Sequence, residues 1–332
     1  DSLSPRQLST KFIYCFLPRH HLPWSSLRSR FTDIILHHII SIIMKSFLDS
    51  IPQIYVINLD HRTDRWDEFQ KRWEPYLDFS KVVRISAVYG SELSSYGKKP
   101  WFTDHTGDRA KSWAGAAGCV LSHRRVIEIA QQSTHDYVLV LEDDACPSQF
   151  FSMANQDRYL SQFIGINNQW GICYLGFNGS FSRGIPMHAD KNSGFELWKV
   201  HGALTTHAYL VNREVYHTLL QYLPTEENVW AWIARYRAID TWLQQQFSQR
   251  THLNVLICIP QLVIQSDSFS DIGQHVTTNL TKDLSLRPRA VSAFTYWLGQ
   301  TISAPFVKLG RFINETRKYT RSKYRGLPGK KK

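Results

Sequence analysis

Three consecutive carboxylates, Glu142, Asp143 and Asp144, directly follow the apolar run YVLVL. Charges of one sign at the end of a buried strand repel one another and lose solvation, so a compensating group is expected nearby. Carboxylate oxygens are hard ligands that suit Mg2+ or Mn2+, ions that typically use one or two protein carboxylates together with substrate phosphates. The alternatives are a solvated acidic turn and an acidic cluster at the start of the next helix. The residue chemistry favours a divalent metal site.

Two other segments carry polar side chains that could contact a nucleotide. YVINLDHRTDRW places Asn58 at the end of an apolar run, with Arg62 and Arg65 at the start of a helical segment, where phosphates could meet cationic donors and a helix N-terminus. GAAGCVLSHRR carries Ser122 and His123 on an otherwise apolar helix. The two arginines could equally be surface cations, and a lone histidine on such a helix is more often a packed core residue than a catalyst.

Hydrophobic patterning predicts the elements that must position these groups. Strands are expected at residues 53–59, 81–87, 137–141 and 170–176, with helices at 61–73, 113–132 and near 148–163. Thr63 or Asp64 should cap the first helix, and Pro75 should end it. Strands alternate with helices, as in a parallel α/β sheet, and ligands of such sheets bind beyond the carboxyl ends of the strands. The acidic trio sits at such an end.

The second half of the chain is less regular. Strands are expected at residues 195–202 and 206–212, a late strand followed by a loop within 254–265, and helices at 213–223 and 238–247. We expect one α/β domain with added elements, spanning residues 51–287, after an N-terminal extension (1–50) and before a basic tail (288–332). Residues 1–43 precede the first methionine, Met44, and are expected to be disordered or to lie outside the native reading frame.

The basic residues of the chain are concentrated in its tails. The formal net charge is +11, but residues 306–332 hold ten Lys and Arg against one Glu, and residues 1–43 hold five against two. The body is therefore close to neutral, and no specific nucleic acid partner is expected. The C-terminal tail could contact an anionic membrane surface or be a solvated, disordered end.

The longest apolar run, IILHHIISII, is too short to span a bilayer, so no transmembrane segment is expected. The five cysteines are scattered and form no CxxC pair, which indicates neither a disulfide framework nor a zinc site. These features favour a cytoplasmic protein.

The chain resembles glycosyltransferase family 25, the lipooligosaccharide β-galactosyltransferase and procollagen galactosyltransferase group, in six ordered segments: IYVINLDHRTDRW, GAAGCVLSHRRVIEIA, YVLVLEDDA, THAYLVNREVYHTLL, AIDTWLQ and PQLVIQSDSFSDI. The resemblance covers about residues 53–275. It implies a GT-A type fold, in which a Rossmann-like nucleotide-binding sheet carries added C-terminal elements. It also implies that a hexose, usually galactose or glucose, is transferred from a UDP-sugar with inversion of the anomeric centre.

The resemblance assigns expected roles to residues of this sequence. The expected ligands of Mn2+ or Mg2+ are Asp144 first and Asp143 second. The donor pocket should include Asn58, Arg62, Arg65, Ser122, His123 and Glu142. The matching segment IDTWL makes Asp240 a further candidate site residue.

The transfer itself requires a base and a stabilised leaving group. A bound cation stabilises the charge that develops on UDP, and a carboxylate or histidine must take the proton of the acceptor hydroxyl. If the reaction inverts, one base suffices. We expect Asp240 to be that base, with Asp143 as the second catalytic candidate, although Asp240 could instead be a helix N-cap. His207 could complete the metal shell, contact phosphate, or be structural.

The expected acceptor is a hydroxyl of a glycan, a lipooligosaccharide or a protein. Two other functions remain open on sequence grounds. A metal-dependent phosphoesterase that acts on nucleotides could also use clustered aspartates beside a sheet. A non-catalytic protein that binds glycans or nucleic acids through its tail would keep its affinity without Asp143 and Asp144.

Overall fold

The structure is a computed structural model that describes residues 47–103, 105–152, 169–178, 183–189, 195–266, 268–270, 275–277, 284 and 287–325. The chain divides into two compact units, residues 1–45 and 46–332, and every described residue belongs to the second unit. The predicted N-terminal extension lies almost wholly outside the described residues, and so does most of the helix predicted near 148–163.

Within the described residues, eight strands form one sheet in the order β2-β1-β3-β8-β5-β9-β7-β6. These strands are β1 (Ile54–Asn58), β2 (Val82–Ser86), β3 (Tyr137–Glu142), β5 (Trp170–Asn178), β6 (Ile185–Ala189), β7 (Glu196–Val200), β8 (Leu204–Asn212) and β9 (Asn254–Ile259). Two small antiparallel pairs join β4 (Ala145–Pro147) to β10 (Val263–Gln265), and β11 (Ser268–Ser270) to β12 (His275–Thr277).

The sheet is mixed, which corrects the expectation of a parallel sheet. β2, β1 and β3 are mutually parallel, as the alternating pattern predicted, and β5 and β9 are also parallel. β8 inserts antiparallel between β3 and β5, and β7 and β6 continue antiparallel beyond β9. Buried strands are apolar in either direction, so the sequence pattern does not reveal strand polarity.

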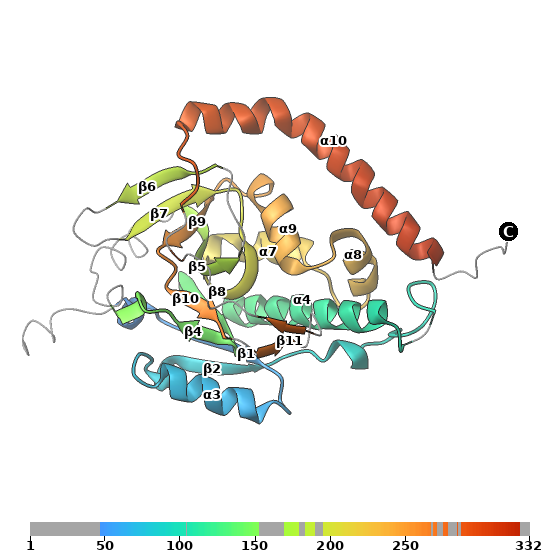
Figure 1. The fold of residues 1–332 in the computed structure, drawn as a ribbon, viewed down its shortest axis with the longest axis horizontal. Coiled ribbons are helices and arrows are strands. Elements are labelled where there is room, and N and C mark those ends of the chain that lie inside the picture. The colour runs from blue at the N-terminus through green and yellow to red at the C-terminus, as the bar shows by residue number, and fades with distance from the viewer. Residues whose placement is uncertain are drawn as a thin grey trace, which may run out of the picture. The chain divides into compact units, whose positions relative to one another are not determined.

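The helices cover both faces of the sheet (Figure 1). The helices of the described residues are α3 (Thr63–Trp73), α4 (Asp108–Gln132), α7 (Tyr216–Tyr222), α8 (Val229–Tyr236), α9 (Ile239–Gln246) and α10 (Ala293–Arg325), of which α10 packs on α8 and does not cover a face of the sheet. Successive residues of a strand point to opposite faces, so Tyr55 and Ile57 pack with α4, α7, α8 and α9, while Ile54 and Val56 pack with Phe69 and Trp73 of α3. The result is a layered α/β structure with one core on each side of the sheet.

Most predicted elements of the body are confirmed, with changes at the ends of helices. α4 begins at Asp108, five residues before the predicted start at Trp113, because the polar first turn carries no apolar signal. α3 begins at Thr63 after Arg62, and no side-chain cap is formed, so the expected capping by Thr63 or Asp64 is wrong. The sequence pattern also gave no prediction for α8, although this helix is mostly buried.

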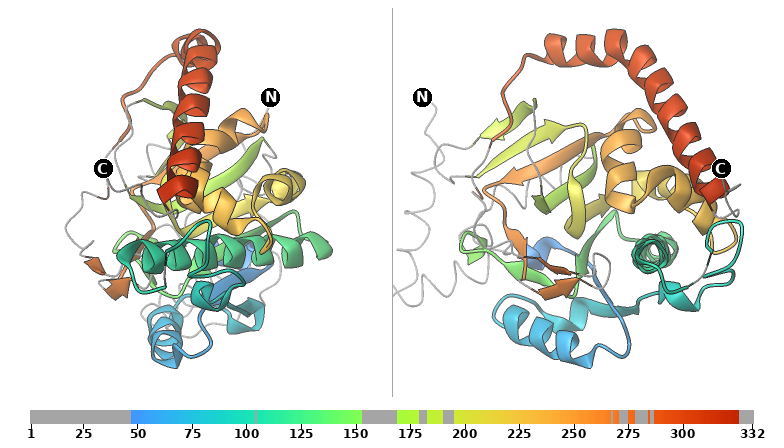
Figure 2. Two further views of the ribbon diagram at one scale, coloured as in Figure 1. Left: turned by 90° about the vertical axis from the view of Figure 1, so that its right-hand side faces the viewer. Right: turned by 45° about the vertical axis from the view of Figure 1, so that its right-hand side comes forward.

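Residues 293–325 belong to the tail that was expected either to contact an anionic membrane surface or to be solvated and disordered, and they form the long helix α10. Arg287 Nε, just before the helix, pairs with Glu196 at 2.9 Å, and Tyr296 stacks on His201 with ring centroids 4.4 Å apart. Figure 2 shows α10 running from the β6–β7 end of the sheet toward α8. α10 is bent in Figure 1, and it contains Pro305, which has no backbone N–H to donate within the helix.

Candidate functional site

The predicted site residues meet at the carboxyl ends of β1 and β3. Because these strands are parallel neighbours, with Ile57 opposite Glu142, the residues that follow both strands lie at the same edge of the sheet. A cavity of about 410 Å³ lies there, between this edge, the loop after β2 and one side of α4. The predicted residues in its lining are Asn58, Arg65, Ser122, His123, Glu142, Asp143 and Asp144.

Asp143 is buried and is compensated by protein groups. Asn58 Nδ2 donates to its Oδ2 at 2.6 Å, and the Arg65 guanidinium lies 2.6 Å from its Oδ1. Burial still raises the pKa of Asp143, against the opposing effects of Arg65 and Asn58. Asn58 is oriented in turn by Arg84, which donates to its Oδ1 at 2.5 Å. These contacts hold the carboxylate in one position at the edge of the cavity.

Asp144 has weaker compensation than its neighbour. Its Oδ2 lies 3.3 Å from the Arg65 guanidinium and 3.5 Å from Gln265 Nε2. Its Oδ1 is buried, and no hydrogen-bond partner for it occurs among the described residues. Burial, followed by the charge on Glu142, raises the pKa of Asp144 to about 7. A buried carboxylate oxygen without a donor is unfavourable when ionised, so this oxygen is suited to a cation.

Glu142, the first member of the trio, is held by a buried polar network. Thr206 Oγ1 donates to its Oε1 at 2.7 Å, and His123 Nε2 lies 3.2 Å from the same oxygen. Burial opposes the charge of Glu142, but these contacts outweigh it and lower its pKa. Tyr209 Oη lies 2.9 Å from His123 Nδ1, which fits a ring with its proton on Nε2 and with Tyr209 donating to Nδ1.

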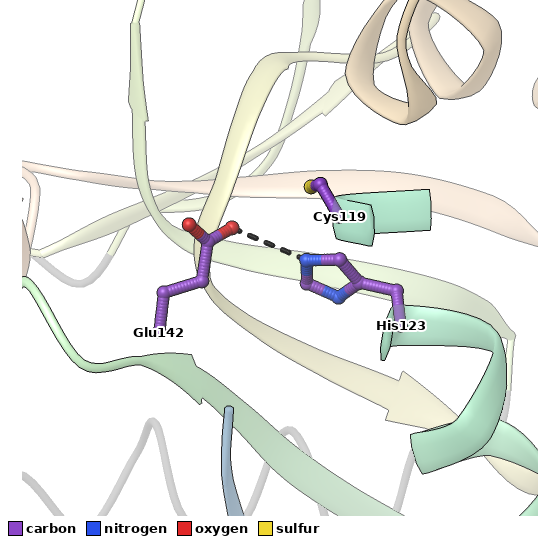
Figure 3. Close-up of side chains that lie close together, drawn as sticks. All are labelled: Cys119, His123 and Glu142. Atoms are coloured by element: carbon purple, nitrogen blue, oxygen red, sulfur yellow. Dashed lines mark hydrogen bonds and ion pairs between the residues drawn. The ribbon is translucent and has the colours of Figure 1, made fainter. Parts of the chain in front are cut away.

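Cys119 adds a thiol to this network (Figure 3). Cys119 and His123 are four residues apart on α4 and therefore share one face, and one donor atom from each lies within 4.8 Å of the others and of a Glu142 oxygen. A thiolate, an imidazole and a carboxylate are ligand types that suit zinc. Burial, and then the charges of Glu142 and Asp240, raise the pKa of the Cys119 thiol well above its ordinary value. The protein groups alone therefore keep this thiol protonated.

Ser122 joins α4 to the loop that forms the opposite wall. Its Oγ accepts from the backbone N–H of Val88 at 2.8 Å and donates to the carbonyl of Gly118 at 2.6 Å. A Cβ at Gly118 would overlap the Val88 carbonyl, and a Cβ at Gly90 would overlap the Ala114 carbonyl. Glycine at both positions lets the loop lie directly against the helix, which fixes the width of the cavity.

Arg62 and Arg65, predicted together, have different environments. Arg65 lines the cavity and bridges Asp143 and Asp144. Arg62 is the residue before α3, and its guanidinium pairs with Asp64 at 2.9 Å. It is not among the described residues that line the cavity, although its charge still lowers the pKa of Asp143.

Asp240 of α9 and His207 of β8 both contact Thr205, near the start of β8. Asp240 is the second residue of α9 after the cap residue Ala238, so the N-cap alternative is wrong. Its Oδ2 accepts from the backbone N–H of Thr205 at 3.1 Å, and Thr205 has a left-handed φ of 67°. Strain of this kind in a non-glycine residue is often found at functional sites.

His207 is buried, with Nδ1 3.1 Å from Thr205 Oγ1 and Nε2 3.3 Å from the Val263 carbonyl. Neither His207 nor Asp240 belongs to the described lining of the cavity. Their roles as metal ligand and base stay predictions.

The residues present fit a divalent cation at Asp144. The buried, unpartnered Oδ1 and the raised pKa both indicate a carboxylate that a positive charge would stabilise. Asp143 has little need of one, since Asn58 and Arg65 already compensate it. Coordination of a metal by Asp144 and Asp143 stays a prediction.

Several contributors to the site were not predicted from the sequence. Thr206, Tyr209 and Arg84 are brought in by pairing between strands distant in sequence, and no local pattern marks them. Cys119 could have been found, because its spacing of four residues from His123 on a predicted helix places both on one face.

One family of known proteins matches the chain. No curated protein matches the chain at a significant level. The sequence profile of glycosyltransferase family 25, described as an LPS biosynthesis protein family, matches residues 51–229, which is more than half of the 332 residues. The matched region contains the strands β1 and β3, the helix α4 and the whole acidic trio. The chain belongs to glycosyltransferase family 25.

Proposed function

We propose that the chain is a metal-dependent, inverting glycosyltransferase with a GT-A type fold. It moves a hexose, galactose or glucose, from a UDP-sugar to a hydroxyl of a glycan, lipooligosaccharide or protein acceptor. The observation that carries the proposal is the cavity at the carboxyl edge of β1 and β3, where Asp144 presents a buried oxygen without a partner among the described residues. Family membership supports glycosyl transfer as the reaction class.

The donor diphosphate fits the side of the cavity that carries Arg65. The Arg65 guanidinium already bridges Asp143 and Asp144, so its cationic donors lie beside the carboxylates that would hold Mn2+ or Mg2+. When bound, the cation would stabilise the negative charge that develops on the leaving UDP. Asp144 and Asp143 would hold it, while Asn58 keeps Asp143 in place.

Asp240 is the proposed base that accepts the proton of the acceptor hydroxyl. Its Oδ2 accepts from the backbone N–H of Thr205, the residue before Thr206, whose hydroxyl donates to Glu142 in the cavity lining. The strained backbone at Thr205 fixes its orientation through the N–H donated to Oδ2. Contacts of a catalytic base with its substrate commonly tighten only when the substrate is bound, so we expect Asp240 to approach the acceptor hydroxyl in the complex.

The test is incubation with a panel of UDP-sugars in the presence of Mn2+ or EDTA. We expect UDP release from one hexose donor with Mn2+, little with EDTA, and a product whose mass has increased by one hexose. Asp144→Asn should lower turnover by about a hundredfold or more, because charge stabilisation of the leaving group is lost. The control is Asp67→Asn, the same change at an exposed aspartate of α3, which should leave turnover unchanged.

Three outcomes would contradict the proposal. Full metal-dependent turnover in Asp144→Asn would show that Asp144 is not a required ligand of the metal. Full turnover in Asp240→Asn would remove the assigned base. Release of inorganic phosphate without a glycosylated product would identify a phosphoesterase instead.

A further inference from the structure

The helix α10 carries a face of exposed apolar side chains. Leu309, Phe312 and Ile313 are 58%, 63% and 49% exposed, although residues of these types are usually buried. Their spacing of three and four residues places them on one side of the helix. Phe294, near the start of the helix, is also exposed.

Other side chains hold α10 against the body of the protein. Tyr296 stacks on His201, and Gln246 Nε2 donates to Glu315 Oε1 at 2.7 Å. Near the end of the helix, Tyr319 packs on Trp101 with ring centroids 5.5 Å apart. The helix is therefore docked at both ends while its apolar face stays accessible to solvent.

The charge of α10 is strongly positive. Residues 293–325 hold seven basic side chains and one acidic side chain: Lys308, Arg311, Arg317, Lys318, Arg321, Lys323, Arg325 and Glu315. Of these, Arg317, Arg321 and Lys323 are exposed. Arg317 and Arg321 follow Ile313 at intervals of four residues, so these exposed cations continue the apolar side of the helix toward its C-terminus. Exposed Phe, Leu and Ile combined with exposed Lys and Arg are features of helices that lie in the interface of a membrane.

The positive charge of α10 also indicates which kind of partner its apolar face could bind. A second copy of the chain would bring two helices of net positive charge together, which is unfavourable. A bilayer with anionic headgroups offers both a compartment for the apolar side chains and a complementary charge. No helix in the described part of the chain meets the length and hydropathy needed to cross a bilayer, so the contact would be with the membrane surface.

We propose that α10 binds the surface of anionic bilayers, with Leu309, Phe312 and Ile313 inserted among the lipids and the basic side chains contacting the headgroups. The proposal stands on the helix alone and does not rest on the proposed reaction. It goes beyond charge attraction by a disordered tail, because it requires a folded helix and specific apolar positions.

The test is sedimentation of the full chain with vesicles of phosphatidylcholine, alone or mixed with phosphatidylglycerol. We expect binding to the mixed vesicles to be at least about tenfold stronger and to weaken as salt is added. The double variant Leu309→Ser/Phe312→Ser should lose most of this binding. The matched control is Ile129→Ser, which removes an exposed apolar side chain from α4 and should bind as the wild type does.

A second variant separates the contribution of the basic side chains to vesicle binding from that of the inserted apolar side chains. Replacement of Arg317, Arg321 and Lys323 by Gln should lower affinity for the anionic vesicles on the order of a hundredfold. Far-UV circular dichroism would verify that each variant is folded. Equal binding to both vesicle types, or unchanged binding by the double variant, would overturn the proposal. Self-association that the double variant abolishes, without vesicle binding, would overturn it in favour of a contact between copies of the chain.

Discussion

The three adjacent carboxylates of the cavity differ in what compensates their charge. Glu142 is held by His123 and Thr206, and Asp143 by Asn58 and Arg65. Both arrangements place a donor within 2.7 Å of a carboxylate oxygen, whereas the contacts to Asp144 are 3.3 and 3.5 Å long. Of the three carboxylates, Asp144 therefore has the greatest need of an added cation, a difference that depends on contacts with side chains distant in sequence.

The raised pKa of Asp144 predicts a pH dependence of stability in the metal-free chain. The ordinary pKa of an aspartate is about 3.9, and burial with the nearby Glu142 charge raises that of Asp144 to about 7. Between these values the folded chain keeps a proton that the unfolded chain has released. The contribution of Asp144 to the free energy of unfolding is therefore full below about pH 4 and is lost as the pH rises through about 7.

Denaturant unfolding in EDTA across this pH range would measure the effect. Asp144→Asn should show a shallower loss of stability with rising pH than the wild type, because the amide does not titrate. Mn2+ at neutral pH should stabilise the wild type and leave the variant unaffected, since a ligand that binds only the folded state raises its stability. Parallel pH profiles for the two proteins would contradict the environment described for Asp144.

Asn58 is predicted to be important for stability as well as for the site. In Asn58→Ala the buried Asp143 carboxylate loses a donor at 2.6 Å, and Arg84 loses an acceptor. Arg65 still pairs with the carboxylate, so the loss is that of a hydrogen bond to a charged group, about 1.5–3 kcal/mol, and the free energy of unfolding should fall by about that amount. Urea unfolding is the measurement. Asn228→Ala is the control: its Oδ1 accepts from the Thr225 backbone in an exposed turn, so a much smaller change is expected.

At the scale of elements, the cavity depends on how closely α4 approaches the loop after β2. Gly90 and Gly118 face each other's backbone at this crossing, and Ser122 ties the two segments together. Gly118→Ala should push the loop away from the helix, since the new Cβ overlaps the Val88 carbonyl. We expect a loss of about 1–3 kcal/mol in the free energy of unfolding and weaker binding of a UDP-sugar by calorimetry.

The same substitution elsewhere provides a matched control. In Gly310→Ala on α10 the new Cβ meets nothing within 4 Å, and alanine is favoured over glycine in a helix by up to about 1 kcal/mol. This variant should therefore be as stable as the wild type or more stable. If both alanine variants changed the free energy of unfolding equally, close packing at Gly118 would not be what determines the stability of this crossing.

The sequence predicted the local elements of the site but not their long-range partners. Apolar runs that end in Asn58 and in the acidic trio placed both at one sheet edge, because parallel neighbours end together. Thr206 and Tyr209 enter through β8, whose antiparallel insertion beside β3 depends on the whole fold. Hydrophobic patterning records which side of a strand is buried, and it contains no information on which strand lies next to it.

At the scale of the whole molecule, α10 shows how composition can mislead. The interleaved Lys and Arg residues of this segment are typical of a solvated tail. Two of its tyrosines, however, contact the body of the protein and hold the segment there as a helix. Tyr296 and Tyr319 lie 23 residues apart and contact different parts of the body, on His201 and on Trp101. Helices fixed at two such points stay docked although most of their surface is polar or exposed.

Docking of the C-terminal half of α10 should therefore depend on Tyr319. Its ring packs against Trp101 and lies 5.5 Å from the Arg235 guanidinium, contacts that together are worth about 1–2 kcal/mol. Tyr319→Ser should increase local opening, and with it trypsin cleavage near Arg317 and Arg321, by about tenfold, while the body unfolds at an unchanged temperature. Phe312→Ser removes an aromatic ring that is 63% exposed on the same helix and should leave the cleavage rate unchanged. Equal acceleration in both variants would mean that helix propensity, and not the contact with Trp101, controls the opening of α10.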